Sequence, residues 1–213
     1  MDLVSGTDAK ARCAWAGIER DEQYQQYHDT EWGRPVTGEA ELFERLSLEA
    51  FQSGLSWLTI LRKRESFRRA FGNFEPAVVA AFGQDDIDRL MADASIVRNL
   101  MKINATIGNA RALLALPQGT TLSQLLASHA PAAVRGAGEP IPGKTAESLQ
   151  LAKVLKKHGF AFVGPTTAYA MMQAVGIVND HQPGCWLAAP LDAAPAAPLG
   201  RDLAPSGEAP EWP

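Results

Sequence analysis

Apolar residues recur along the chain at intervals of three and four positions, which is the spacing of α-helices with one buried face. Alternation of apolar and polar residues over the length of a strand is nearly absent, so the pattern predicts an all-α or nearly all-α fold. Glycine and proline separate the helical segments. Helices are predicted at about residues 39–53, 57–71, 76–81, 85–93, 97–116 and 122–129, in a segment that ends near 158, and at 165–176.

The first two of these helices meet at a corner. Phe43 and Leu46 belong to the buried stripe of the first helix, and Thr37 is placed to cap its N-terminus. Gly54 ends that helix, and Ser56 is placed to cap the next one. The intervening sequence SGLSW is therefore predicted to form a tight connection between two helices.

The segment from residue 145 to 176 predicts a helix, a hairpin with the sequence GFAFVG, and a second helix opened by Pro165. Glycines at both ends of the hairpin allow a ligand to approach the backbone, and the free N–H groups of the second helix favour an anion such as phosphate. An ordinary αα-hairpin packed in the core fits the same pattern. The pattern alone favours that ordinary hairpin, and the neighbouring Lys153, Lys156 and Lys157 reduce this preference without reversing it.

The composition describes a globular chain of 213 residues, 46% of them hydrophobic, which is enough for one substantial core. No apolar run approaches the roughly 18 residues of a membrane span, so we expect a soluble protein. The net charge of −4 gives no overall indication of nucleic-acid binding, although a local basic stripe can still bind it. Residues 1–12 and the Ala/Pro-rich residues 187–213 are predicted to be a flexible extension and tail around a domain at residues 13–186.

Cys13 and Cys185 are the two cysteines of the chain, and each has a histidine nearby, His28 and His181. Two thiolates and two imidazoles are a ligand set of tetrahedral zinc. Taken singly, ordinary packing roles explain such residues better, and a disulfide is a further alternative. Residues 1–12 contain no apolar signal-peptide core, so we expect a cytosolic protein with reduced thiols and favour the metal. Four protein ligands leave no position for water, which predicts a structural zinc joining the two ends of the chain.

Glu49 lies late in the first predicted helix, at the edge of its apolar stripe, and Trp57 follows the corner. A surface carboxylate and an aromatic core are the commoner interpretation of such residues. The alternative is a stacking slot for a planar, electron-poor ligand. Further aromatic residues crowd the segment that holds Cys13 and His28, namely Trp15, Tyr24, Tyr27 and Trp32.

The motifs CAW, YHDTEWG, LEAFQSGLSW, LRKRESFRRAF, KKHGFAFVGPT, MQAVGIVNDH and HQPGC, in this order, resemble the 3-methyladenine DNA glycosylase I family, within the helix-hairpin-helix glycosylases. The resemblance spans residues 13–186. It implies a helix-hairpin-helix glycosylase fold and a DNA-repair hydrolase that cuts the N-glycosidic bond of 3-methyladenine and leaves an abasic site. It also implies a monomer that acts on double-stranded DNA in a bacterial cytosol, at the nucleoid.

The resemblance also implies roles for individual residues. Glu49 matches a glutamate that contacts the lesion in the catalytic site, and we hypothesise that it recognises the base rather than activating water. Tyr27 and Trp57 match the residues that enclose the base, and Gly54 and Leu55 match the corner that enters the DNA. The implied zinc ligands are Cys13, His28, His181 and Cys185, and the implied DNA contacts of the hairpin are Gly159, Gly164 and Thr166.

Two rival functions fit the same residues. A zinc-stabilised helical module would bind DNA in a strongly salt-dependent manner and release no base. A zinc hydrolase for a small substrate would need an open metal position.

Overall fold

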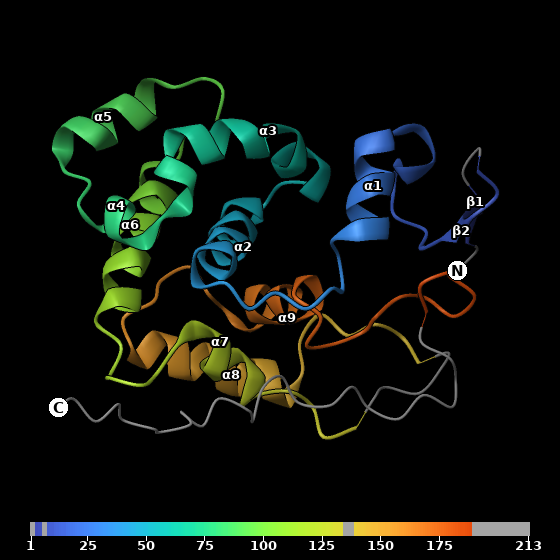
Figure 1. Cartoon of the computed structure of the whole chain (residues 1–213). Coiled ribbons are helices and arrows are strands. Elements are labelled where there is room, and N and C mark those ends of the chain that lie inside the picture. The colour runs from blue at the N-terminus through green and yellow to red at the C-terminus, as the bar shows by residue number, and fades with distance from the viewer. Residues whose placement is uncertain (1–2, 6–7, 134–138, 189–213) are drawn as a thin grey trace, which may run out of the picture.

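The computed structural model describes residues 3–5, 8–133 and 139–188, and it is helical nearly throughout (Figure 1). The predicted fold class is confirmed at this level, and none of the described helices is long and apolar enough to cross a membrane. Short 3-10 helices lie at Ile18–Arg20 (η1) and Gly72–Phe74 (η2), and two-residue strands at Val4–Ser5 (β1) and Ala11–Arg12 (β2) pair antiparallel. The α-helices are α1 Glu22–Thr30, α2 Glu39–Gln52, α3 Trp57–Ala70, α4 Pro76–Ala80, α5 Gln84–Ala92, α6 Leu100–Leu114, α7 Leu122–Ala127, α8 Ala146–Lys157 and α9 Pro165–Ala174.

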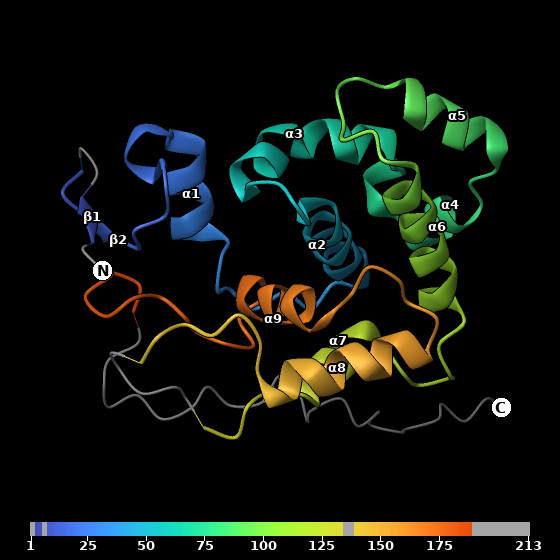
Figure 2. The same ribbon diagram turned by 180° about the vertical axis from the view of Figure 1, so that it is seen from behind.

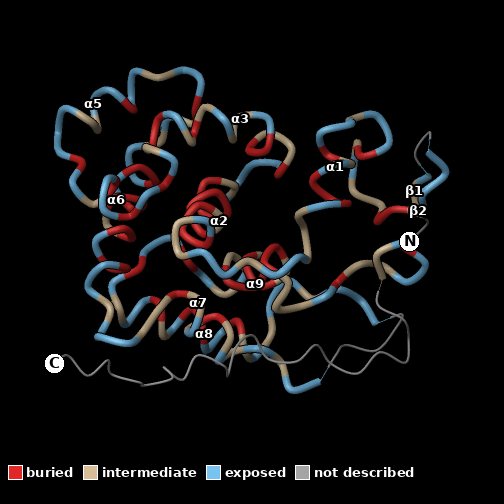
Figure 3. Tube along the Cα trace, viewed as in Figure 1, coloured by how far each residue is buried: buried red, intermediate tan, exposed pale blue. Residues whose placement is uncertain are grey.

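Helix α2 lies at the centre of the molecule in both views of the ribbon (Figures 1 and 2) and packs against α3, α6, α7 and α9. Because neighbours surround it, most of its residues are buried (Figure 3), including polar Ser47 and Glu49. A chain of phenylalanine rings fixes α2 against α3: the centroid of Phe51 lies 4.7 Å from that of Phe67 and 5.9 Å from that of Phe71. The corner between α2 and α3 is therefore held from inside the core.

The helix ends follow local capping. Ser56 caps α3 as predicted, since its hydroxyl accepts a hydrogen bond from the backbone N–H of Thr59 at 3.2 Å. The prediction for α2 was wrong by one position, because Gly38 and not Thr37 occupies its N-cap. The helix predicted at residues 97–116 begins only at Leu100, where the Asn99 side chain accepts from the N–H of Lys102 and caps the helix.

Helix α1 was not predicted from the sequence. Asp21 caps it by accepting from the N–H of Tyr24 at 2.9 Å. The buried residues of α1 are polar or amphipathic, so they form no recognisable apolar stripe. This helix carries Tyr27, which lines a cavity, and His28, which belongs to a cluster of cysteines and histidines.

The two ends of the described chain lie side by side (Figures 1 and 2). The N–H of Trp186 donates to the carbonyl of Ala11 at 2.8 Å, next to the strand pair of β1 and β2. Within the predicted N-terminal extension, Arg12 is buried. The predicted tail from residue 189 onward lies outside the described residues, and the domain limits remain predictions.

Candidate functional site

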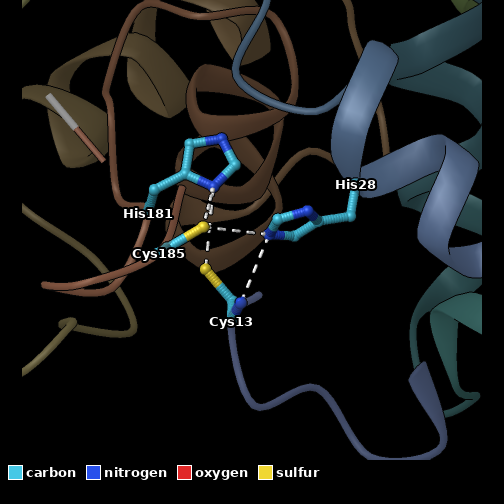
Figure 4. A group of neighbouring side chains, drawn as sticks. All are labelled: Cys13, His28, His181 and Cys185. Carbon is cyan, nitrogen blue, oxygen red and sulfur yellow. Dashed lines mark hydrogen bonds between the residues drawn. The ribbon is translucent and has the colours of Figure 1, made fainter. Parts of the chain in front are cut away.

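The structure brings the four predicted metal ligands together from the two ends of the described chain (Figure 4). Their ligand atoms all lie within 4.8 Å of one another. Cys13, His28 and Cys185 are buried, and His181 is partly buried. Cys13 directly follows β2 and His28 lies on α1, whereas His181 and Cys185 lie on the loop after α9. These residues could hold a metal ion.

The spacing of the cluster tests whether such an ion would fit. The Cys13 Sγ lies 3.6 Å from the His181 Nδ1, and the Cys185 Sγ lies 3.5 Å from the His28 Nε2 and 3.6 Å from the His181 Nδ1. With Zn–S bonds of about 2.3 Å and Zn–N bonds of about 2.0–2.1 Å, a tetrahedral zinc ion separates sulfur from nitrogen by about 3.6 Å. Donor set and spacing therefore fit an ion of this size.

The protonation of the two thiols also favours a cation. The hydrogen bond to Cys185, with burial, raises the pKa of Cys13 well above its usual range, while the same bond lowers the pKa of Cys185 to about 2. The opposite directions of these two pKa shifts mean that the neighbouring thiols do not both ionise readily. Two thiolates side by side need a positive charge between them.

A second layer of side chains orients His28. Its Nδ1 donates to the Asp29 Oδ1 at 2.9 Å, which turns Nε2 toward the cysteines, where it also accepts from the backbone N–H of Cys13 at 3.4 Å. The Arg12 guanidinium donates to both oxygens of Asp29, at 2.9 and 2.7 Å, and the Trp186 indole donates at 3.1 Å. Burial alone would raise the pKa of Asp29, but these hydrogen bonds outweigh it and lower the pKa to about 2. Asp29 therefore stays ionised and accepts the hydrogen bond of the imidazole N–H.

An open cavity of about 380 Å³ lies beside the metal cluster, within the size range of small-molecule sites. The rings of Tyr27 and Trp57 form part of its wall, with centroids 5.1 Å apart and an interplanar angle of 42°. The predicted base-enclosing residues and Glu49 thus share one cavity. Its lining residues are Trp15, Ala16, Tyr24, Tyr27, Trp32, Glu49, Gln52, Trp57, Ile141, Ala170 and Gln173.

Glu49 is buried in this cavity, and among the described residues its carboxylate has no hydrogen-bond partner. Burial raises its pKa to about 8, a shift that the positive charge of Arg45 opposes. Arg45 lies one turn before Glu49 on α2, bonds Glu31 at 2.7 Å, and stands 5.7 Å from the centroid of the Tyr27 ring. An unpaired acceptor among aromatic rings suits a planar ligand that donates hydrogen bonds or carries positive charge.

A smaller hollow of about 230 Å³ adjoins the cavity and shares Glu49, Gln52 and Ala170 with it. Its wall includes three residues with predicted DNA contacts, Gly54, Leu55 and Thr166. Gly54 has a φ of +82°, a conformation natural to glycine, and the side chain of Leu55 is exposed. The two hairpin glycines, residues 159 and 164, do not line this hollow; they lie at the end of α8 and the start of α9.

Sequence reasoning missed several residues of the site. Gln52, Ile141, Ala170 and Gln173 line the cavity although none was singled out from the sequence. Gln173 falls inside the motif MQAVGIVNDH, which is the one signal that pointed to its neighbourhood. Arg45 carried no signal, because a single arginine on a helix is usually a solvated surface residue.

The chain is similar to known proteins along most of its length. Residues 15–188 match the family model described as methyladenine glycosylase. The chain is similar to DNA-3-methyladenine glycosylase 1 of Escherichia coli, with 45% identity over 82% of this chain and 95% of that protein. A homologous glycosylase of Haemophilus influenzae is 42% identical over 82% of this chain and 96% of its own length.

Solved structures are similar as well. A crystal structure of 3-methyladenine DNA glycosylase I matches with a TM-score of 0.79 and 44% identity, covering 84% of this chain and all of that one. The structure of the Staphylococcus aureus enzyme, described as the basis of its 3-methyladenine recognition, matches with a TM-score of 0.73 and 36% identity, covering 78% of this chain and 91% of that one.

Proposed function

The chain belongs to the methyladenine glycosylase family, and from that premise we propose that the cavity holding Glu49 receives a flipped 3-methyladenine base. The protein is an enzyme of DNA base-excision repair that hydrolyses the N-glycosidic bond of 3-methyladenine, releasing the base and leaving an abasic site. The observation that carries the proposal is a buried carboxylate with no hydrogen-bond partner among the described residues, in a cavity whose wall includes the rings of Tyr27 and Trp57.

Methylation at N3 makes the base a cation while it is still attached to the sugar. When the bond between C1′ and N9 breaks, its electron pair stays on N9 and cancels that charge, and water then adds to C1′ and loses a proton. The leaving group therefore needs no proton from the enzyme, and selection of the damaged base is the harder task. Stacking of the base on Tyr27 and Trp57 favours a cation by about 0.5–2 kcal/mol. Glu49 accepts a hydrogen bond from the exocyclic amine of the base.

We propose double-stranded DNA as the partner. Extruding a nucleotide costs a few kcal/mol, and it costs least for a damaged, poorly paired base. The exposed Leu55, held at the corner by the conformation of Gly54, is placed to fill the space that the nucleotide leaves. The α8–turn–α9 segment serves as the helix-hairpin-helix element, in which the turn that Gly159 and Gly164 bracket, with Thr166 in the first turn of α9, contacts DNA phosphates.

We propose that the metal held by Cys13, His28, His181 and Cys185 is one structural Zn²⁺ ion. When bound, the ion would neutralise two thiolates and cross-link the two ends of the domain. Four protein ligands complete a tetrahedral shell, so no residue of the cluster is assigned a part in bond cleavage. We further propose that the enzyme acts as a monomer in the cytosol, where thiols stay reduced.

The test is to incubate the purified protein with methylated duplex DNA and to separate the released bases by chromatography. Free 3-methyladenine supports the proposal. Salt-dependent binding without release would favour the DNA-binding module instead. Glu49→Gln is the decisive variant: if it kept full binding of the lesion and lost only cleavage, Glu49 would be an activator of water and not a recognition residue. Glu44→Gln is the matched control, because Glu44 is also buried on α2 but pairs with Arg68 away from the cavity.

A further inference from the structure

Gln173 on α9 lines the cavity, and a hydrogen bond fixes the orientation of its side-chain amide. The Gln173 Nε2 donates to the Asp180 Oδ2 at 2.7 Å. A carboxylate only accepts hydrogen bonds, so the nitrogen and not the oxygen of the amide must face Asp180. Among the described residues the Gln173 Oε1 has no hydrogen-bond partner. The amide therefore keeps an acceptor available on the side away from Asp180.

The anchor of this amide is itself fixed. Asp180 is 1% exposed, and the same Oδ2 also accepts from the hydroxyl of the buried Tyr169 at 2.6 Å. Tyr169 and Gln173 are one turn apart on α9, whereas Asp180 directly precedes the metal-ligand candidate His181. The loop that carries two of the metal ligands thus also sets the orientation of Gln173. Turning the amide over would bring its oxygen against a buried carboxylate, which is costly.

Resting on the function proposed above, we propose that Gln173 is a specificity-determining residue, whose fixed Oε1 accepts a hydrogen bond from the amine at C6 of the flipped purine. Glu49 and Gln173 line the same cavity, and both offer acceptors. An adenine derivative presents two N–H donors at C6, whereas a guanine derivative presents a carbonyl oxygen there. Two acceptors facing each other leave both without a partner, so methylated guanine is disfavoured.

Gln52 provides the internal comparison. It lines the same cavity from the end of α2, but none of the described residues holds its amide. An unanchored amide can turn either its nitrogen or its oxygen toward the ligand, so it does not distinguish an amine from a carbonyl.

The experiment uses one methylated duplex that contains both 3-methyladenine and 3-methylguanine, and it measures the ratio of the two initial release rates. Gln173→Met, which preserves volume and removes the amide, should lower the preference for adenine about tenfold, the effect of losing a single hydrogen bond. Gln52→Met is expected to leave the ratio unchanged, even if both rates fall. Quenching of the cavity tryptophans by the two free bases measures the same preference without DNA.

The outcomes separate the two proposals. If the unmodified enzyme releases no 3-methyladenine, the proposed function fails. If the enzyme releases it and Gln173→Met keeps the original ratio, or changes it no more than Gln52→Met does, the assignment of Gln173 is overturned. Thermal melting and metal content verify the fold of each variant, and Gln173→Ala replaces Gln173→Met if the latter does not fold.

Discussion

Glu49 is buried among aromatic rings, and this environment decides its charge. Burial raises its pKa to about 8 against the influence of Arg45, so near pH 6 the carboxyl of the empty cavity is mostly neutral. The methylated base carries a permanent charge and prefers the ionised form. Since kcat/KM reports the pKa of the free enzyme, we expect it to rise with pH between about 6 and 8. Excision of 3-methyladenine under subsaturating conditions measures this profile.

The matched variants decide whether Glu49 causes the rise. Glu49→Gln should flatten the profile and lower kcat/KM about 10- to 100-fold at high pH, the loss expected for a hydrogen bond to a charged group. Glu44→Gln should keep the slope, because that carboxylate pairs with Arg68 and does not line the cavity. An unchanged slope in Glu49→Gln would show that another group titrates.

Asp29 links Arg12 of the N-terminal segment to His28 of the metal cluster by hydrogen bonds. It accepts from His28, Arg12 and Trp186, and it thereby fixes the imidazole with Nε2 toward the cysteines. Asp29→Asn should weaken metal binding about 10- to 100-fold, as loss of an outer-shell partner does. Competition with a chelating dye measures the affinity. Asp8→Asn, which removes the more exposed partner of Arg12, is the control, and equal losses in both variants would contradict this role.

Site residues of rare types could be predicted from the sequence, whereas a residue whose role depends on its orientation could not. Two cysteines and few histidines leave little choice of metal ligands, and the structure brings all four together. Tyr27, Glu49 and Trp57 were predicted by the resemblance, and they share one cavity. Gln173 could not be predicted, because its role comes from the orientation that Asp180 imposes, which only the tertiary structure contains.

At the scale of elements, α6 connects the two segments proposed to contact DNA. The ammonium of Lys102 donates to the carbonyls of Phe51 and Ser53, at 2.8 and 2.6 Å, and so holds the end of α2 beside the corner. Two turns along the same face, the side chain of Asn109 clasps the backbone of Ala161 in both directions, at 3.0 and 2.7 Å. A single rigid helix thus fixes the corner and the hairpin about 10 Å apart along its axis.

Loss of one anchor should separate DNA binding from base binding. Asn109→Ala frees the hairpin, so we expect duplex affinity to fall about tenfold, in line with one or two lost hydrogen bonds, while the free base still quenches the cavity tryptophans as before. Thr106→Val is the control, since the one partner of its hydroxyl in the described part of the chain is the Lys102 carbonyl, within α6. Equal losses of duplex and free-base affinity in Asn109→Ala would indicate general disruption and contradict the role of α6.

The helices themselves were largely predictable where an apolar stripe and a capping residue coincide. Phe43 and Leu46 mark α2, and Ser56 marks the start of α3. Helix α1 escaped prediction because it buries polar or amphipathic residues and so lacks an apolar stripe. These residues are Tyr24, Tyr27, His28 and Asp29, and Asp29 takes further hydrogen bonds from Arg12 and Trp186, outside the helix. The spacing of apolar residues in the sequence identifies helices that bury an apolar face. It misses a helix such as α1, whose buried residues belong to a functional site.

At the scale of the whole molecule, the metal cluster closes the chain on itself. Cys13 meets His181 across 168 positions, and the helices from α1 to α9 lie within this loop. A cross-link stabilises the folded state by restricting the unfolded chain, by about 5 kcal/mol for a loop this long in the chain-entropy model. In a chain of this size about 1 kcal/mol shifts Tm by 2–4 °C, so removing the metal should lower Tm by about 10–20 °C.

Calorimetry before and after treatment with a strong chelator measures this shift, and elemental analysis reports whether zinc was bound. Adding Zn²⁺ back should restore Tm and the excision of 3-methyladenine together, because the ion acts through the fold. Cys185→Ser should melt at the low temperature with or without Zn²⁺, since it removes one ligand from the C-terminal side of the loop. If the chelated protein were metal-free and yet melted like the untreated enzyme, the packing of Trp186 and Arg12 around Asp29 would join the chain ends without an ion.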